Sequence, residues 1–134
     1  MIALILLHNC FAATQDVAIV GRGLGIGGAG LVVAPAWDFG QGAWLHGRMA
    51  MLRAVEGGFT LVRSTRNGTM TVSDRYGRVL AESASGPTAP LLMTQASVSR
   101  NEPTIYSRAG DVFGWACVGV VLLFIVSGRS HRSA

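Results

Sequence analysis

The sequence contains no lysine, so all 11 of its basic residues are arginines. Schiff-base sites, lysine general bases and P-loops all need a lysine ammonium, which arginine does not replace in these roles. The sequence therefore excludes these three kinds of site. The formal net charge is +4. Because the arginines are scattered among apolar segments, we expect no binding to nucleic acid.

Cysteine and histidine are also scarce. The two cysteines, Cys10 and Cys117, lie in or just after apolar segments, which is typical of unpaired thiols and not of a disulfide framework. The sequence has no CxxC or HExxH motif, and its three histidines are far apart. We therefore expect no metal and no other cofactor. With 134 residues, half of them hydrophobic, the chain has room for one modest domain.

The first ten residues, "MIALILLHNC", predict a buried strand. They have an uncharged start and only seven apolar residues, whereas a signal peptide has a basic start and a longer apolar stretch. Cys10 then lies at the carboxyl end of a strand, where α/β proteins usually place reactive groups. The alternative is an inert, half-buried thiol, which is the commoner state of a lone cysteine.

The next segment, "DVAIVGRGLGIGGAG", imitates a dinucleotide-binding motif. Gly23, Gly25 and Gly28 have the GxGxxG spacing and follow the strand-like "VAIV". A true motif opens a helix that holds the pyrophosphate, but here only Ala29 and Gly30 separate the glycines from the strand-like "LVVAPAW". The context argues against binding of NAD or FAD.

Residues 44 to 56 predict an amphipathic helix. Leu45, Met49, Leu52 and Val55 recur at helical spacing, and Gly57-Gly58 provides a stop. The polar residues of this helix are spaced so that they can face one cleft or one neighbouring strand; they are His46, Arg53 and Glu56. A solvated Arg53–Glu56 ion pair is the alternative.

A β-meander follows. The alternating runs "FTLVRST" and "TMTVSD" are joined by "RNG", which favours a tight hairpin turn at Asn67-Gly68. A second turn, "DRYG", leads to "RVLAE", and "LLMTQASV" (91–98) predicts a further strand.

The uncharged run 112–126 predicts a helix that crosses a membrane. Fifteen helical residues cover about 22 Å, so the flanking residues must contribute to span a hydrocarbon core of roughly 30 Å. Arg129 and Arg132 follow the run and Asp111 precedes it. The positive-inside rule then predicts a cytoplasmic tail and places residues 1–111 on the opposite side.

An ordered series of motifs runs through these elements: "PAWDFG" (35–40), the pattern from Trp44 to Glu56, "LVRSTRNG" (61–68) and "TVSDRYGRVLAE" (71–82). This series resembles the carboxyl-terminal part of a nitrilase, or carbon-nitrogen hydrolase, domain. The domain it resembles most is that of bacterial apolipoprotein N-acyltransferases, in which a segment similar to "PTIYSRAGD" precedes a last membrane helix. The resemblance covers about residues 31–126.

The resemblance implies an α/β fold that is part of an α-β-β-α sandwich, with a Glu-Lys-Cys triad. In this family the cysteine attacks a phospholipid acyl ester, forms a thioester and passes the acyl group to the amino-terminal cysteine of a lipoprotein. On this sequence, Cys10 is the only candidate nucleophile. Trp37 is expected to line the acyl-binding pocket, and His46, Arg53 and Glu56 are expected to be structural residues near the site.

Two departures from the family pattern limit what the chain is expected to do alone. Phe11 and Ala12 follow Cys10 where the family usually has an acidic residue, and no lysine is present to complete a triad. We therefore expect a fragment that is inactive by itself and that needs the missing amino-terminal half of the same enzyme.

These inferences give the following organisation. Residues 1–100 form a partial carbon-nitrogen hydrolase domain, 101–111 a linker, 112–127 a transmembrane helix and 128–134 a basic cytoplasmic tail. The expected location is the bacterial inner membrane with the domain in the periplasm, and the expected partners are a phospholipid acyl donor, a lipoprotein acceptor and the membrane. The alternatives are a nitrilase or amidase and a non-catalytic remnant of either enzyme.

Overall fold

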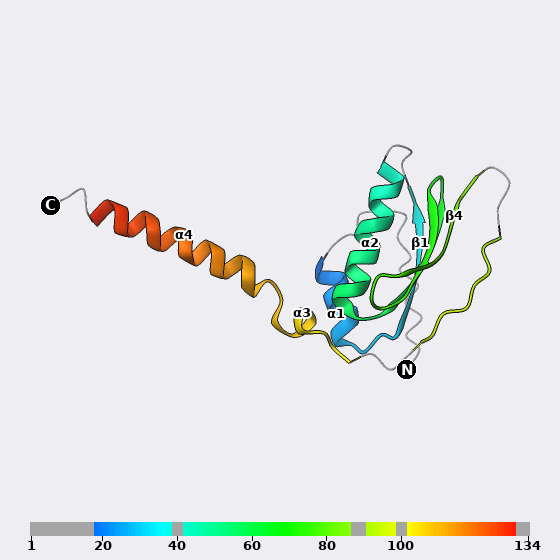
Figure 1. Cartoon of the computed structure of the whole chain (residues 1–134), viewed down its shortest axis with the longest axis horizontal. Coiled ribbons are helices and arrows are strands. Elements are labelled where there is room, and N and C mark those ends of the chain that lie inside the picture. Colours follow the sequence, from blue (N-terminus) through cyan, green and yellow to red (C-terminus); the bar gives the residue numbers. More distant parts are fainter. Residues whose placement is uncertain (1–17, 39–41, 87–90, 99–101, 131–134) are drawn as a thin grey trace.

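A computed structural model describes residues 18–38, 42–86, 91–98 and 102–130, which contain four helices and four strands. Two helices, α1 and α2, lie on one face of a single sheet, and α4 extends away from it (Figure 1). The predicted α/β class is confirmed. In chain order the elements are α1 (Ala18–Ile26), β1 (Leu31–Trp37), α2 (Ala43–Gly57), β2 (Thr60–Arg66), β3 (Thr69–Ser73), β4 (Val79–Ala84), α3 (Ile105–Ala109) and α4 (Val112–Ser130).

The sheet has the strand order β1-β2-β3-β4. β1 and β2 are parallel and are joined through α2, whereas β2, β3 and β4 form an antiparallel meander. The predicted hairpin is confirmed, and Asn67 in its turn has a φ of 59°, which asparagine tolerates better than most residues. The second predicted turn is also confirmed, because the Gly77 N–H donates to the Asp74 carbonyl.

The predicted helix over residues 44–56 is confirmed as α2, and Gly58, whose φ is 76°, caps its carboxyl end. Its buried face, however, consists of small residues with Met51: Ala43, Gly47, Ala50, Met51, Ala54 and Gly57. Of the four large apolar residues that suggested the helix, three are exposed, with Leu45 and Leu52 at 55% and 50%, and only Met49 is half-buried. Small side chains allow the helix to lie close to the sheet and to α1, so here periodicity identified the helix but not its packed face.

The strand-like reading of "VAIV" is wrong, because Ala18–Ile26 is a helix, α1. Its glycines mask a helical pattern in which Val20 and Leu24 line the interior, while Gly21 and Gly25 face α2. A Cβ at Gly25 would lie 2.6 Å from both the Gly57 carbonyl oxygen and the Ser107 hydroxyl. The glycines of this segment therefore serve close helix packing.

The strand predicted for residues 91–98 is also wrong, because this segment is neither helix nor strand. Leu91 and Met93 are 85% and 83% exposed, and the Thr60 hydroxyl donates to the Ser97 carbonyl at 3.1 Å. A run of apolar residues forms a strand only where a neighbouring strand can pair with it. The side-chain composition of residues 91–98 suggested a β-strand, but no described strand pairs with this segment.

Helix α3 lies within the segment predicted as a linker, and it packs against α1 and α2. Thr104 caps it by accepting from the Ser107 N–H at 3.0 Å. The hydroxyls of Thr104 and Ser107 both donate to the Glu56 carbonyl at the end of α2, and the Arg22 Nε donates to the Ser107 carbonyl at 2.9 Å. The "PTIYSRAGD" motif thus attaches the segment before α4 to both helices.

The run 112–126 is helical, as predicted, but within the described residues no helix is long and apolar enough to cross a membrane. The transmembrane assignment of residues 112–127 is therefore not supported. The uncharged part of α4 ends at Gly128 and covers about 25 Å, less than a hydrocarbon core of roughly 30 Å. The periplasmic placement of residues 1–111 and the cytoplasmic placement of the tail stay predictions.

We predict that two alanine substitutions in α1 have opposite effects on stability. Gly25→Ala lowers the free energy of unfolding by about 1–3 kcal/mol, because the new methyl group meets the backbone of α2 and the Ser107 hydroxyl. Gly23→Ala raises it by up to about 1 kcal/mol, because nothing lies within 4 Å of the new methyl group and alanine favours the helix. Urea unfolding followed by circular dichroism measures both.

The matched pair separates packing from helix propensity. Equal effects of the two substitutions would contradict the close contact of α1 with α2 and α3.

Candidate functional site

The site lies where the parallel strands β1 and β2 end, an edge at which α/β proteins commonly bind ligands. Trp37 and Arg66 are paired across these strands, and the Asp38 N–H donates to the Arg66 carbonyl at 3.0 Å. The Arg66 guanidinium carbon lies 5.0 Å from the centre of the Trp37 ring, within cation-π range. Trp37 is 42% exposed, so its ring is available to a ligand.

A buried ion pair lies directly beneath this rim. Asp38 follows Trp37, and alternation along the strand directs its side chain to the opposite face, under α2. The two terminal guanidinium nitrogens of Arg63, Nη1 and Nη2, donate to the two Asp38 carboxylate oxygens at 2.9 and 2.5 Å. Neither side chain is more than 1% exposed. The Thr65 hydroxyl donates to Asp38 Oδ2 at 3.0 Å, so the carboxylate has three donors.

The same carboxylate also fixes the β2–β3 turn. A Cβ at Gly68 would overlap the Asp38 carboxylate, so only glycine fits there. Arg63 donates in addition to the Thr69 carbonyl, at 3.3 Å. The end of β1 and the hairpin turn are therefore held together by charge-assisted hydrogen bonds away from water.

Arg53 and Glu56 form the ion pair that their spacing predicted, at 2.7 Å. Burial raises the pKa of the Glu56 carboxyl, and nearby Asp111 adds to this, whereas the Arg53 guanidinium opposes it. Both residues lie toward the carboxyl end of α2, next to α1 and α3. Trp37 is the last residue of β1, and this strand ends near the amino end of α2 (Figure 1). His46 is seven residues before Arg53, about 10 Å along the helix. The structure thus groups Arg53 with Glu56 but not with Trp37.

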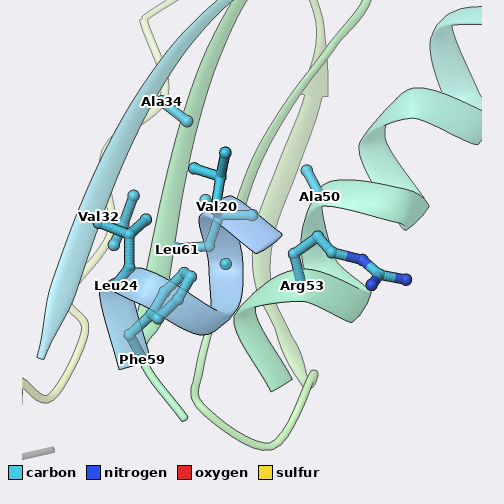
Figure 2. Close-up of a pocket in the computed structure, with 9 residues that line it drawn as sticks. Val20, Leu24, Val32, Ala34, Ala50, Arg53, Phe59 and Leu61 are labelled. Carbon is cyan, nitrogen blue, oxygen red and sulfur yellow. The ribbon is translucent and has the colours of Figure 1, made fainter. Parts of the chain in front are cut away.

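An apolar cavity lies between α1, α2 and the sheet (Figure 2). Val20 and Leu24 line it from the helix side, Val32 and Leu61 line it from the strands, and Arg53 stands at its border. Its volume is about 20 Å³, about the space of one water molecule. It is too small for an acyl chain.

The predicted nucleophile, Cys10, lies outside the described residues. The other cysteine, Cys117, is exposed on α4. Among the residues that the structure places, no group of three histidine, cysteine or acidic side chains could hold a metal ion.

Sequence reasoning missed the Asp38–Arg63 pair and Arg66. A signal was present for Arg63, which shares the strand face of buried Leu61 and Thr65, as period-2 alternation requires. A charged residue at a core-facing position predicts a buried partner of opposite charge. No such pattern identifies Arg66, because its role depends on strand register.

We predict that breaking the buried pair is costly. Arg63→Met or Asp38→Asn each lowers the free energy of unfolding by about 3–5 kcal/mol, because each leaves a buried charge without its partner. The double variant loses clearly less than the sum of the single losses, since neither charge remains. Urea denaturation of the wild type, the two single variants and the double variant measures the four free energies of unfolding that this comparison needs.

Arg78→Met serves as the control, because its pair with Asp74 is at the surface. Its expected effect is about 1 kcal/mol or less. Additive losses in the Asp38–Arg63 cycle would show that the two residues do not act as a pair.

The chain resembles known proteins in sequence and, more weakly, in structure. No family model matches the chain. The apolipoprotein N-acyltransferase of Bradyrhizobium diazoefficiens is 31% identical over 121 residues, which is 90% of this chain and 22% of the relative. That of Rhodopseudomonas palustris is 31% identical over 86 residues, which is 64% of this chain and 16% of the relative.

Solved structures give a weaker likeness. A nitrilase-superfamily amidase from Nesterenkonia is 25% identical with a TM-score of 0.48, covering 52% of this chain and 30% of the amidase. The chain spans about a fifth of the length of the curated relatives it matches. The resemblance predicted from the motifs is confirmed: the chain is similar to part of the apolipoprotein N-acyltransferases.

Proposed function

We propose that this chain supplies the nucleophile-bearing part of an N-acyltransferase of the carbon-nitrogen hydrolase type. The observation that carries the proposal is the 31% identity to an apolipoprotein N-acyltransferase over 90% of the chain. The rim formed by Trp37 and Arg66 is the candidate binding edge for the acyl donor.

In the proposed reaction, the Cys10 thiolate attacks the carbonyl carbon of a phospholipid acyl ester. The C–O bond breaks, a lysophospholipid leaves with a proton on its oxygen, and a thioester remains on Cys10. The amino group of a lipoprotein's first residue then attacks the thioester, which forms an amide and returns the thiol. A carboxylate base and a lysine from outside this chain would complete the machinery.

The topology supports a position for Cys10 near Trp37. α1 leads directly into β1, and β1 has no strand partner on its outer edge among the described residues. A strand formed by residues 1–10 and running parallel to β1 would make a β-α-β unit with α1. Its carboxyl end, with Cys10, would then lie at the same edge as Trp37 and Asp38.

The sheet face opposite the helices supports a missing partner layer. Leu31, Val33, Val62 and Met70 alternate onto this face and are half-buried, whereas Val72 on the same face is buried. An apolar sheet face is normally covered by a second layer. We propose that the remaining part of the enzyme provides that layer, as the second sheet of an α-β-β-α sandwich.

A chimera tests the proposed reaction. The segment of the Bradyrhizobium diazoefficiens enzyme that matches this chain is replaced by residues 1–134. We predict that the chimera acylates an apolipoprotein and accumulates a hydroxylamine-sensitive acyl-enzyme. Cys10→Ser removes both, with at least a hundredfold loss of turnover, because no thioester can form.

Cys117→Ser is the matched control, because it removes the other cysteine from the exposed surface of α4 and should leave turnover unchanged. Full activity of the Cys10→Ser chimera would reject Cys10 as the nucleophile. A well-expressed chimera without acyl transfer would favour the remnant, and hydrolysis of simple amides without acyl transfer would favour a nitrilase or amidase.

We further propose that α4 contacts lipid. It has no charged residue between Val112 and Gly128, and its large side chains are exposed, with Phe113, Trp115 and Phe124 at 83%, 74% and 76%. Exposed apolar surface on this scale marks an interaction site. A lipid surface fits it because the apolar residues lie on all sides of the helix.

We predict that α4 controls sedimentation of the chain with phosphatidylcholine vesicles. Leu123→Glu reduces the bound fraction severalfold, because it places a charge in the apolar surface. Tyr76→Glu, on the exposed second turn of the meander, is the control and leaves binding unchanged. Equal binding of the two variants would exclude α4 as the lipid contact.

A further inference from the structure

Arg66 differs from the arginines of the described chain that form ion pairs. Four arginines form ion pairs with carboxylates, namely Arg48–Glu82, Arg53–Glu56, Arg63–Asp38 and Arg78–Asp74. Within the part of the chain that the structure describes, Arg66 has no carboxylate partner, and its guanidinium lies over the Trp37 ring. A positive charge is therefore left open at the rim where β1 and β2 end.

The acid that follows Trp37 in the sequence does not cancel this charge. Asp38 is fully buried beneath the rim, where Arg63 and Thr65 occupy its two carboxylate oxygens. The Asp38–Arg63 pair is neutral as a unit, so Arg66 adds one net positive charge. Its side chain leaves the sheet on the face opposite Asp38, as strand alternation requires.

The geometry of the pair suits a ligand with two parts. A guanidinium stacked on an aromatic ring keeps its N–H groups, in the guanidinium plane, available to donate to an oxyanion, and phosphate accepts two of them at once. The exposed part of the Trp37 ring offers apolar contact beside that anion. The hydrogen bond from the Asp38 N–H to the Arg66 carbonyl and the buried Asp38–Arg63 pair hold the Trp37 and Arg66 side chains next to each other.

We propose that Trp37 and Arg66 form a subsite for the phosphate of an anionic amphiphile, with the glycerol or hydrocarbon portion against the tryptophan ring. We identify this amphiphile with the phospholipid acyl donor, and that identification rests on the proposed function. The phosphate-binding step itself rests only on the open guanidinium and the exposed ring.

The experiment follows the indole N–H signal of Trp37 in the ¹⁵N-labelled full chain, with the three tryptophan signals assigned by Trp→Phe variants. Three probes are titrated: dihexanoyl phosphatidylglycerol below its micelle concentration, inorganic phosphate, and uncharged dihexanoyl glycerol. We expect a saturable shift of the Trp37 signal with the phospholipid, and a weaker response to each of the other two probes.

Arg66→Gln should weaken the phospholipid response by about tenfold, the effect of losing a charge-assisted contact at the surface. Arg48→Gln is the matched control. Arg48 also lies over a tryptophan, 5.3 Å from the centre of Trp44, but Glu82 already holds its guanidinium at 3.0 and 2.9 Å. It should leave the Trp37 response unchanged.

Each outcome decides the proposal. An Arg66→Gln variant that binds the phospholipid as tightly as the wild type would overturn it, and so would the absence of any saturable shift. Equal affinity for inorganic phosphate and the phospholipid would show that the site binds phosphate alone, and would reject an amphiphile as its ligand. Because the assay needs no acyl transfer, an inactive Cys10 chimera would leave this result standing, and a failed titration would leave the reaction standing.

Discussion

The buried Asp38–Arg63 ion pair is the constraint on which the rest of the sheet edge depends. It joins the end of β1 to β2, and through Thr65, Gly68 and the Thr69 carbonyl it fixes the hairpin turn. Two charges taken out of water are costly unless hydrogen bonds replace their hydration; the Asp38 carboxylate has three donors, whereas Nε of Arg63 is buried without a hydrogen-bond partner. This requirement limits the geometry of the turn and of the residues above it. The positions of Trp37 and Arg66 follow from it.

A second constraint acts at the opposite end of α2, where small residues pack closely beside the Arg53–Glu56 ion pair. Gly25, Gly57 and Ser107 bring α1, α2 and α3 so close together that a single methyl group does not fit at Gly25. The Glu56 carbonyl then accepts from both Thr104 and Ser107. The two ends of the helix layer therefore differ in what stabilises them: a fully buried ion pair at the strand ends, and close backbone packing beside a partly exposed ion pair at the other end.

Much of the fold could be predicted from local patterns. The turn at Asn67-Gly68, the meander and the end of α2 at Gly58 are all encoded within a few residues, where turn chemistry and periodicity decide the structure. The errors have a common cause in tertiary contacts. Gly21 and Gly25 concealed a helix because their function is to meet another element, and Leu91 to Val98 has strand-like composition but no strand beside it. Arg63 could have been foreseen from its strand parity, whereas the Trp37–Arg66 pair required the register between β1 and β2.

The order of the strands in the sheet is the order of the strands in the chain. Contacts between β2, β3 and β4 therefore close short loops, whereas β1 reaches β2 only after the chain has passed through α2. Because loop-closure entropy favours the short loops, we expect the meander to nucleate folding and β1 to join it later together with α2. Residues at the β2–β3 turn are thus expected to govern the folding rate, whereas residues at the end of β1 govern mainly the unfolding rate. The candidate binding rim, which needs Trp37 from β1 and Arg66 from β2, is completed only in the last of these steps.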